Sequence, residues 1–150
     1  MLQSGLGHWL QTMTNNQGCA DQKHSFTIFV VDDDPDVRRA MKRLLKTASF
    51  RVETFATAED FLKSERFRRP GVLVLDMRLP GMEGSDLQKA LADSGSTMPI
   101  VFMTAYEDAG LRQEVMKRGA VAFLQKPVEE TVLFDAIRRA EAGERTKSLP

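Results

Sequence analysis

Residues 71–84, Gly-Val-Leu-Val-Leu-Asp-Met-Arg-Leu-Pro-Gly-Met-Glu-Gly, decide the fold of this chain. They begin with an apolar run, stop at an acid, Asp76, and continue into a Pro-Gly turn. A short apolar run between turn signals is typical of a strand buried on both faces of a parallel sheet. Because open α/β sheets bind their ligands beyond the carboxyl ends of the strands, Asp76 becomes a candidate site residue.

Strand-like and helix-like segments alternate on both sides of this stretch. The predicted strands are 26–31, 50–55, 72–75, 99–103 and 121–124, with 50–55 the least apolar and best suited to a sheet edge. Five helices are predicted. The first has Pro35 near its first turn, the second begins at Thr57, and the other three cover 85–92, 107–118 and 129–142. This alternation predicts an α/β doubly wound fold, a five-stranded parallel sheet with helices on both faces. The flavodoxin-like strand order 2-1-3-4-5 is one such arrangement.

Hydrophobic periodicity predicts which helix residues face the core. The helix that opens at Thr57 is expected to carry Phe61, Leu62 and Phe67 inward. The inward positions expected of the last helix are Val132, Leu133, Ala136, Ile137 and Ala140.

Composition narrows the class of protein. The chain has 150 residues, of which 42% are hydrophobic and 28% charged, which predicts one globular domain. We expect this domain to cover 26–145, after a polar, disordered extension at 1–25 and before a short tail at 146–150. Lys plus Arg and Asp plus Glu both number 21, and this balance argues against electrostatic attachment to nucleic acid or an anionic membrane. A single cysteine, Cys19, and the lack of an apolar span of about 20 residues suit a cytoplasmic protein.

Polar residues follow four of the five predicted strands. Asp32 and Asp33 follow the first strand, Asp76 the third, Thr104 the fourth and Lys126 the fifth. Carboxylates crowded at one sheet edge repel each other unless a cation neutralises them, and such an oxygen-rich cluster suits Mg²⁺. A lysine and a hydroxyl would stabilise a phosphoryl group, for which an Asp carboxylate is an established nucleophile. The pattern therefore predicts Mg²⁺-dependent phosphorylation of Asp76.

Four segments, Val-Val-Asp-Asp-Asp-Pro, Leu-Asp-Met-Arg-Leu-Pro-Gly-Met-Glu-Gly, Met-Thr-Ala and Gln-Lys-Pro, resemble the signatures of response-regulator receiver domains. The resemblance covers 26–142, in the family's order and spacing. It implies that Asp76 is the phosphoacceptor and that Thr104 and Lys126 bind phosphoryl oxygens. It also implies a metal site of Asp32, Asp33, Asp76 and the backbone carbonyl of Arg78, taking Mg²⁺ or, as a substitute, Mn²⁺.

The same resemblance assigns further roles. Phe123 matches the switch aromatic that responds with Thr104, against the ordinary alternative of strand packing. Arg78 and Tyr106 are expected to border the phosphoryl group and tune its lifetime, although both could simply be exposed loop residues. The Lys126–Pro127 bond is expected to be cis.

The family implies a histidine kinase or phosphotransfer protein as phosphodonor. The fourth helix, fifth strand and fifth helix would form a phosphorylation-dependent dimer face. The Arg-Leu-Pro-Gly and Lys-Pro-Val-Glu-Glu segments most resemble those of the nitrogen-fixation-type subfamily, whose members usually carry a C-terminal helix-turn-helix domain. We therefore expect a signalling switch rather than an enzyme, and the receiver part of a transcriptional regulator, with no direct nucleic-acid binding by this chain and no membrane association.

Other readings stay open. One is a stand-alone single-domain regulator or phosphate shuttle. Another is a pseudo-receiver scaffold, against which the full set of acids, Thr104 and Lys126 argues. A third is a Mg²⁺-dependent phosphohydrolase, but the Asp-x-Asp arrangement expected of aspartate-nucleophile phosphatases is absent, because Met77 and Arg78 follow Asp76.

Overall fold

The computed structural model describes residues 26–143 of the chain, so the extension expected at 1–25 and the tail expected at 146–150 lie outside it. The strands are β1 (Thr27–Val31), β2 (Arg51–Phe55), β3 (Gly71–Asp76), β4 (Ile100–Thr104) and β5 (Ala122–Gln125). The helices are α3 (Pro35–Thr47), α4 (Ala58–Ser64), α5 (Gly84–Asp93), α6 (Ala109–Lys117) and α7 (Glu130–Glu141), and a 3-10 turn, η1 (Arg66–Arg68), follows α4.

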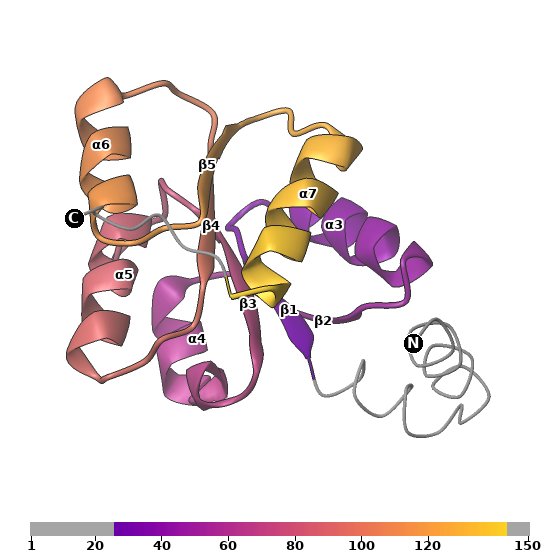
Figure 1. Ribbon diagram of the computed structural model, residues 1–150, viewed down its shortest axis with the longest axis horizontal. Helices are drawn as coiled ribbons and strands as arrows, with labels where there is room; N and C mark the ends of the chain where they lie inside the picture. The colour runs from indigo at the N-terminus through magenta and orange to yellow at the C-terminus, as the bar shows by residue number, and fades with distance from the viewer. Residues whose placement is uncertain (1–25, 144–150) are drawn as a thin grey trace, which may run out of the picture.

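The strands form one parallel sheet in the order β2-β1-β3-β4-β5, which confirms the doubly wound, flavodoxin-like arrangement. Helices α3 and α7 cover one face of the sheet, and α4, α5 and α6 cover the other (Figure 1). Because all strands run the same way, their carboxyl ends lie at one edge of the molecule.

The apolar runs in the sequence are explained by burial on both sheet faces. In β1, Phe29 and Val31 belong to the cluster beneath α4, α5 and α6, whereas Ile28 and Val30 belong to the cluster beneath α3 and α7. Successive side chains of a strand point to opposite faces, so a strand covered on both sides is apolar throughout. Edge strand β2 differs as expected, since Val52 is its only buried residue.

The structure corrects two details of the expected helices. Helix α4 ends at Ser64 because Glu65 adopts a left-handed conformation (φ 56°), so Phe67 lies in η1 and reaches the core from there. Val132 was expected to face inward, and this was wrong: it is 43% exposed. The buried face of α7 is set by Leu133, Ala136, Ile137 and Ala140 at helical spacing, and Val132 is offset from it by one position.

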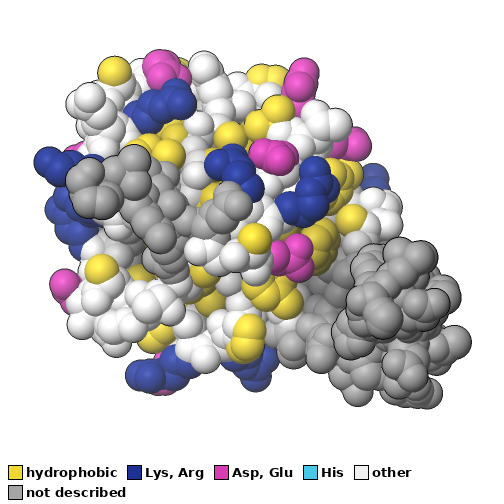
Figure 2. Space-filling view, in the orientation of Figure 1, with side chains coloured by type: hydrophobic (Ala, Val, Ile, Leu, Met, Phe, Trp, Pro, Cys, Tyr) yellow, Lys and Arg dark blue, Asp and Glu magenta, His cyan; other side chains and the backbone are white. Residues whose placement is uncertain are grey.

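The surface carries both signs of charge. On the face seen in Figure 2, Lys and Arg side chains lie among Asp and Glu side chains. In the part of the chain that the structure describes, no helix combines the length and apolar character needed to cross a membrane.

Candidate functional site

Four strand ends bring the predicted site residues to one edge of the sheet. Asp32 directly follows β1, Asp76 is the last residue of β3, Thr104 is the last residue of β4, and Lys126 directly follows β5. Asp32, Asp76 and Thr104 are buried, with 0%, 5% and 1% of their surface exposed. Buried polar groups at a strand end are costly unless they are paired, so their partners define the site.

Lys126 pairs with two of the acids. Its ammonium Nζ lies 2.7 Å from Asp32 Oδ2 and 3.3 Å from Asp76 Oδ2, and its side chain is 22% exposed. The Lys126 backbone N–H also donates to the carbonyl of Thr104 at 2.7 Å, which ties the β5 end to the β4 end. The Lys126–Pro127 peptide bond is cis, as the sequence resemblance implies.

Three carboxylates converge beside this lysine. Asp32, Asp33 and Asp76 each offer an oxygen, and these oxygens lie within 4.8 Å of one another. Asp33 is exposed, so the cluster opens to solvent. This all-oxygen donor set, larger in negative charge than one lysine can balance, fits a hard divalent cation.

Neighbouring groups hold Asp32 in place. The Asp34 N–H donates to Asp32 Oδ1 at 2.9 Å, and the Arg38 guanidinium donates to the Asp32 carbonyl at 2.7 Å. Asp34 itself serves the helix, because its side chain accepts from the Asp36 N–H and caps α3. Sequence reasoning missed Arg38; its position one helical turn after Asp34 was the only available signal.

The electrostatics of the site favour a bound cation. Burial raises the pKa of Asp76, and repulsion from Asp32 raises this pKa further, while Lys126 opposes both effects. Burial lowers the pKa of the Lys126 ammonium, but the hydrogen bond from Lys126 to Asp32 and the charges of both acids outweigh it, so the net pKa is raised. Lys126 is therefore held charged, and Asp76 is a carboxylate whose ionisation the site does not fully compensate.

The loop after β3 returns closely to the phosphoacceptor candidate. The Arg78 N–H donates to Asp76 Oδ1 at 3.2 Å, while the Arg78 side chain is exposed. The Gly84 N–H donates to the Met77 carbonyl at 3.0 Å. A Cβ on Gly84 would lie only 2.6 Å from the Asp76 carbonyl oxygen, so this close return requires glycine.

The Thr104 side chain is hydrogen-bonded to the loop that follows β4. Its hydroxyl donates to the Tyr106 carbonyl at 2.9 Å and accepts from the Tyr106 N–H at 3.2 Å. The Tyr106 side chain is 71% exposed. These two hydrogen bonds tie the Thr104 hydroxyl to the loop between β4 and α6.

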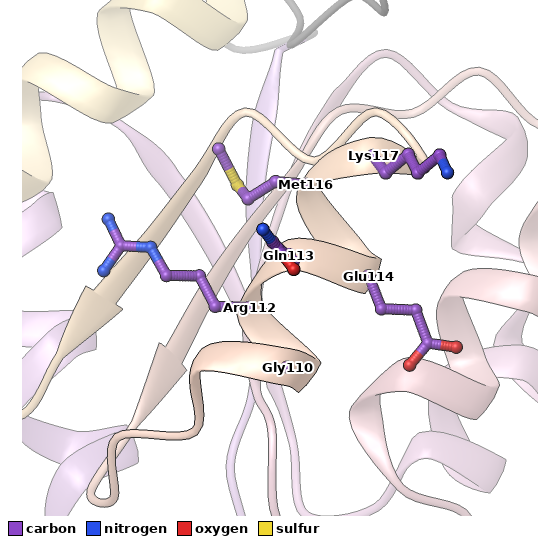
Figure 3. Close-up of a pocket in the computed structure, with 6 residues that line it drawn as sticks. All are labelled: Gly110, Arg112, Gln113, Glu114, Met116 and Lys117. Atoms are coloured by element: carbon purple, nitrogen blue, oxygen red, sulfur yellow. The ribbon is translucent and has the colours of Figure 1, made fainter.

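Phe123 is buried (7% exposed) in β5 beside Phe102, with ring centroids 6.4 Å apart. Arg112 extends from α6 on the side away from Glu114 and Lys117 (Figure 3), and its guanidinium lies 5.6 Å from the centroid of the Phe123 ring. The hollow drawn in Figure 3 is lined by α6 residues alone and includes none of the strand-end site residues.

Comparisons with known proteins agree with this geometry. A family model described as the response regulator receiver domain matches residues 28–138. The chain is 42% identical over 119 residues to the transcriptional regulatory protein TdiR of Thauera aromatica, covering 79% of this chain and 52% of that protein. It is 39% identical over 115 residues to the transcriptional regulatory protein FixJ of Rhizobium meliloti, covering 77% of this chain and 56% of that protein. The chain thus spans about half the length of the curated relatives it matches.

Solved structures give the same result. The response regulator StyR superposes with a TM-score of 0.75 at 47% identity, covering 79% of this chain and 60% of that one. FixJ-N superposes with a TM-score of 0.73 at 38% identity, covering 79% of this chain and 95% of that one. The family model and these relatives agree on the same assignment, and the chain belongs to the response regulator receiver domain family, close to the FixJ-type transcriptional regulators.

Proposed function

We propose that Asp76 is phosphorylated in a Mg²⁺-dependent reaction by a histidine kinase or a phosphotransfer protein. The observation that carries this proposal is the convergence of three carboxylates and Lys126 Nζ on one strand-end edge. Receiver domains are signalling proteins rather than conventional enzymes, so the reaction changes the protein itself.

The site residues have separate roles in phosphoryl transfer. An Asp76 carboxylate oxygen attacks the phosphorus of the donor's phosphohistidine; the new O–P bond forms as the P–N bond breaks, and the electron pair returns to the histidine nitrogen. Lys126 and the Thr104 hydroxyl stabilise the negative charge spread over the phosphoryl oxygens. Asp32, Asp33, Asp76 and the Arg78 carbonyl would hold Mg²⁺, or Mn²⁺ in its place, and the bound ion would supply positive charge to the phosphoryl oxygens.

Phosphorylation then changes the surface of the domain. Thr104 exchanges its bonds to Tyr106 for the phosphoryl group, the β4–α6 loop shifts, and Phe123 repacks with it. In this proposal α6, β5 and α7 form the surface that changes, either for an output domain or for a second copy of the chain. Residues 26–145 are the whole receiver unit, acting in the cytoplasm as the receiver part of a transcriptional regulator.

Intact-mass measurement tests the chemistry. The protein is incubated with acetyl phosphate and Mg²⁺, alongside Asp76→Asn and a sample with excess chelator. We expect one added phosphoryl group on the unaltered protein and none in either control. A folded protein that gains no mass would overturn the proposal in favour of the pseudo-receiver reading.

Two further assays separate the remaining readings. Repeated turnover of p-nitrophenyl phosphate would indicate a phosphohydrolase, whereas a receiver dephosphorylates only itself. A phosphorylated receiver that passes its phosphoryl group to a histidine phosphotransfer protein, with no change in its own association, would indicate a phosphate shuttle.

A further inference from the structure

Glu59 links α4 to the loop between β3 and α5, which directly follows the phosphoacceptor Asp76. Its Oε2 accepts a hydrogen bond from the Met82 backbone N–H at 2.9 Å, across 23 residues of sequence. Glu59 lies in the first turn of α4 and is partly buried. None of the sequence motifs described above includes Glu59, and no role was predicted for it from the sequence.

The loop is shaped around this carboxylate. Gly81 has φ +74°, a conformation that side chains disfavour. A Cβ built on Gly81 would lie 2.6 Å from Glu59 Oε2, so the carboxylate occupies the space that glycine leaves. The hydrogen bond from the Met82 N–H favours the ionised carboxylate and is the main cause that lowers the pKa of Glu59.

The remainder of the loop is fixed at its base. The Met77 N–H donates to the Met103 carbonyl at 2.8 Å, and the Gly84 N–H donates to the Met77 carbonyl at 3.0 Å. Leu79 is buried at 7% exposure. Pro80 and Gly81 are exposed, whereas Met82 is partly buried against the cluster beneath α4, α5 and α6, and Glu59 adds a side-chain hydrogen bond to this bend. Arg78, whose N–H donates to Asp76 Oδ1, lies between these two fixed regions.

We propose that Glu59 is a positioning residue for the phosphoacceptor site: its carboxylate holds the bend at 80–82 and thereby the Arg78 backbone beside Asp76. This rests on the proposed function, in which the Arg78 carbonyl joins the metal site. Loss of the anchor lets the loop sample other conformations, so the oxygens of the metal site are less well arranged before the ion binds.

A simpler role for Glu59 must be separated from this one. An acid in the first turn stabilises a helix through the macrodipole, and Asp60 occupies the same turn of α4. Asp60 is exposed, so Asp60→Ala removes a comparable helix charge without touching the bend. Glu59→Gln removes the charge but keeps an oxygen that accepts from the Met82 N–H.

The test uses the full chain and Mg²⁺ alone. Calorimetry gives the Kd for Mg²⁺, and amide hydrogen exchange gives the protection of the Met82 N–H. We expect Glu59→Ala to weaken Mg²⁺ binding by about tenfold, in the range of outer-shell substitutions, and to speed Met82 exchange. Glu59→Gln and Asp60→Ala should both stay within about twofold of the unaltered protein, since outer-shell effects require the bond to be lost.

Three results would overturn the inference: an unchanged Kd in Glu59→Ala, an equal loss in Asp60→Ala, or a loss in Glu59→Gln as large as in Glu59→Ala. Glu59→Ser serves as a second truncation if Glu59→Ala does not fold. Phosphoryl uptake by the unaltered protein is measured beside these variants. If it fails, the proposed function fails; if it succeeds and Glu59→Ala binds Mg²⁺ normally, only the role of Glu59 is refuted.

Discussion

Lys126 Nζ lies 2.7 Å from Asp32 Oδ2, although 94 residues separate the two in the sequence. The contact joins the carboxyl end of β1, near the middle of the sheet, to that of β5 at its edge. Asp32 is fully buried, and Lys126 is the cation paired with both it and Asp76. A single positive side chain therefore faces two buried carboxylates, so at most half of the buried negative charge at the site is balanced before any metal binds.

Lys126→Met should destabilise the metal-free protein at pH 7. Removing one partner leaves Asp32 and Asp76 without their counter-charge, which costs about 3–5 kcal/mol for a fully buried pair. Because 22% of the Lys126 side chain is exposed, we expect a smaller loss, about 2 kcal/mol. Urea denaturation with chelator measures it, and Mg²⁺ should restore part of the loss. Lys117→Met, at an exposed position on α6, is the control, and an equal loss there would contradict the assignment.

Asp76→Asn should stabilise the metal-free protein. The raised pKa of Asp76 means that the folded state disfavours its charge, so the unfolded state ionises first as the pH rises. Wild-type stability therefore falls relative to the variant from about pH 4, the ordinary value for Asp, up to the raised pKa, and stays lower above it. At pH 7 we expect a gain of about 0.5–2 kcal/mol, typical of relieving a functional compromise.

Urea titrations of both proteins at several pH values measure this difference. It should shrink toward zero below pH 4 and should also shrink when Mg²⁺ is added, because the ion stabilises only the protein that binds it well. An Asp76→Asn protein that is less stable at pH 7 would show that the Lys126 bond outweighs burial.

Much of this site could be predicted from sequence because its residues stand at strand ends. A parallel sheet places every carboxyl end at one edge, so Asp32, Asp76, Thr104 and Lys126 needed only the right strand assignments to converge. Glu59 could not be found this way, since its partner is a backbone N–H in a loop, and no residue type marks that contact. The prediction that Val132 is buried was wrong for a related reason. The helical period defines a buried face, but an apolar residue at the border of that face can be buried or exposed.

Gly84→Ala should disturb the phosphoacceptor strand directly. The new methyl group would lie 2.6 Å from the Asp76 carbonyl and 3.0 Å from the Met77 Cα, and backbone at that distance cannot give way cheaply. We expect a loss of about 1–3 kcal/mol, as for overpacked cores, together with weaker Mg²⁺ binding. Thermal or urea unfolding measures the first and calorimetry the second.

Gly110→Ala is the matched control. Its new methyl group would meet only the Asp108 side chain at 3.6 Å, an ordinary contact, within helix α6. Replacing a helical glycine by alanine should stabilise the protein by up to about 1 kcal/mol. If both glycine variants lost stability equally, the close return of the loop onto Asp76 would not be the cause.

Arg78 and Tyr106 should set how long the phosphoryl group on Asp76 survives. Both side chains are exposed, and each lies two residues beyond a site residue. We expect them to obstruct the water that attacks phosphorus. Their replacement by Ala should leave the free energy of unfolding within about 0.5 kcal/mol, because neither is buried. Dephosphorylation of the double variant should be about 3–10-fold faster, because water would reach the phosphorus more easily. A tenfold change corresponds to a barrier lowered by about 1.4 kcal/mol. Intact mass followed over time after removal of acetyl phosphate gives the rate, with Lys89→Ala, exposed on α5, as the control. The backbone groups of Tyr106 that contact Thr104 in the unphosphorylated protein are kept in this variant, so an unchanged rate would assign the lifetime to the Thr104, Lys126 and metal-binding groups instead of these two side chains.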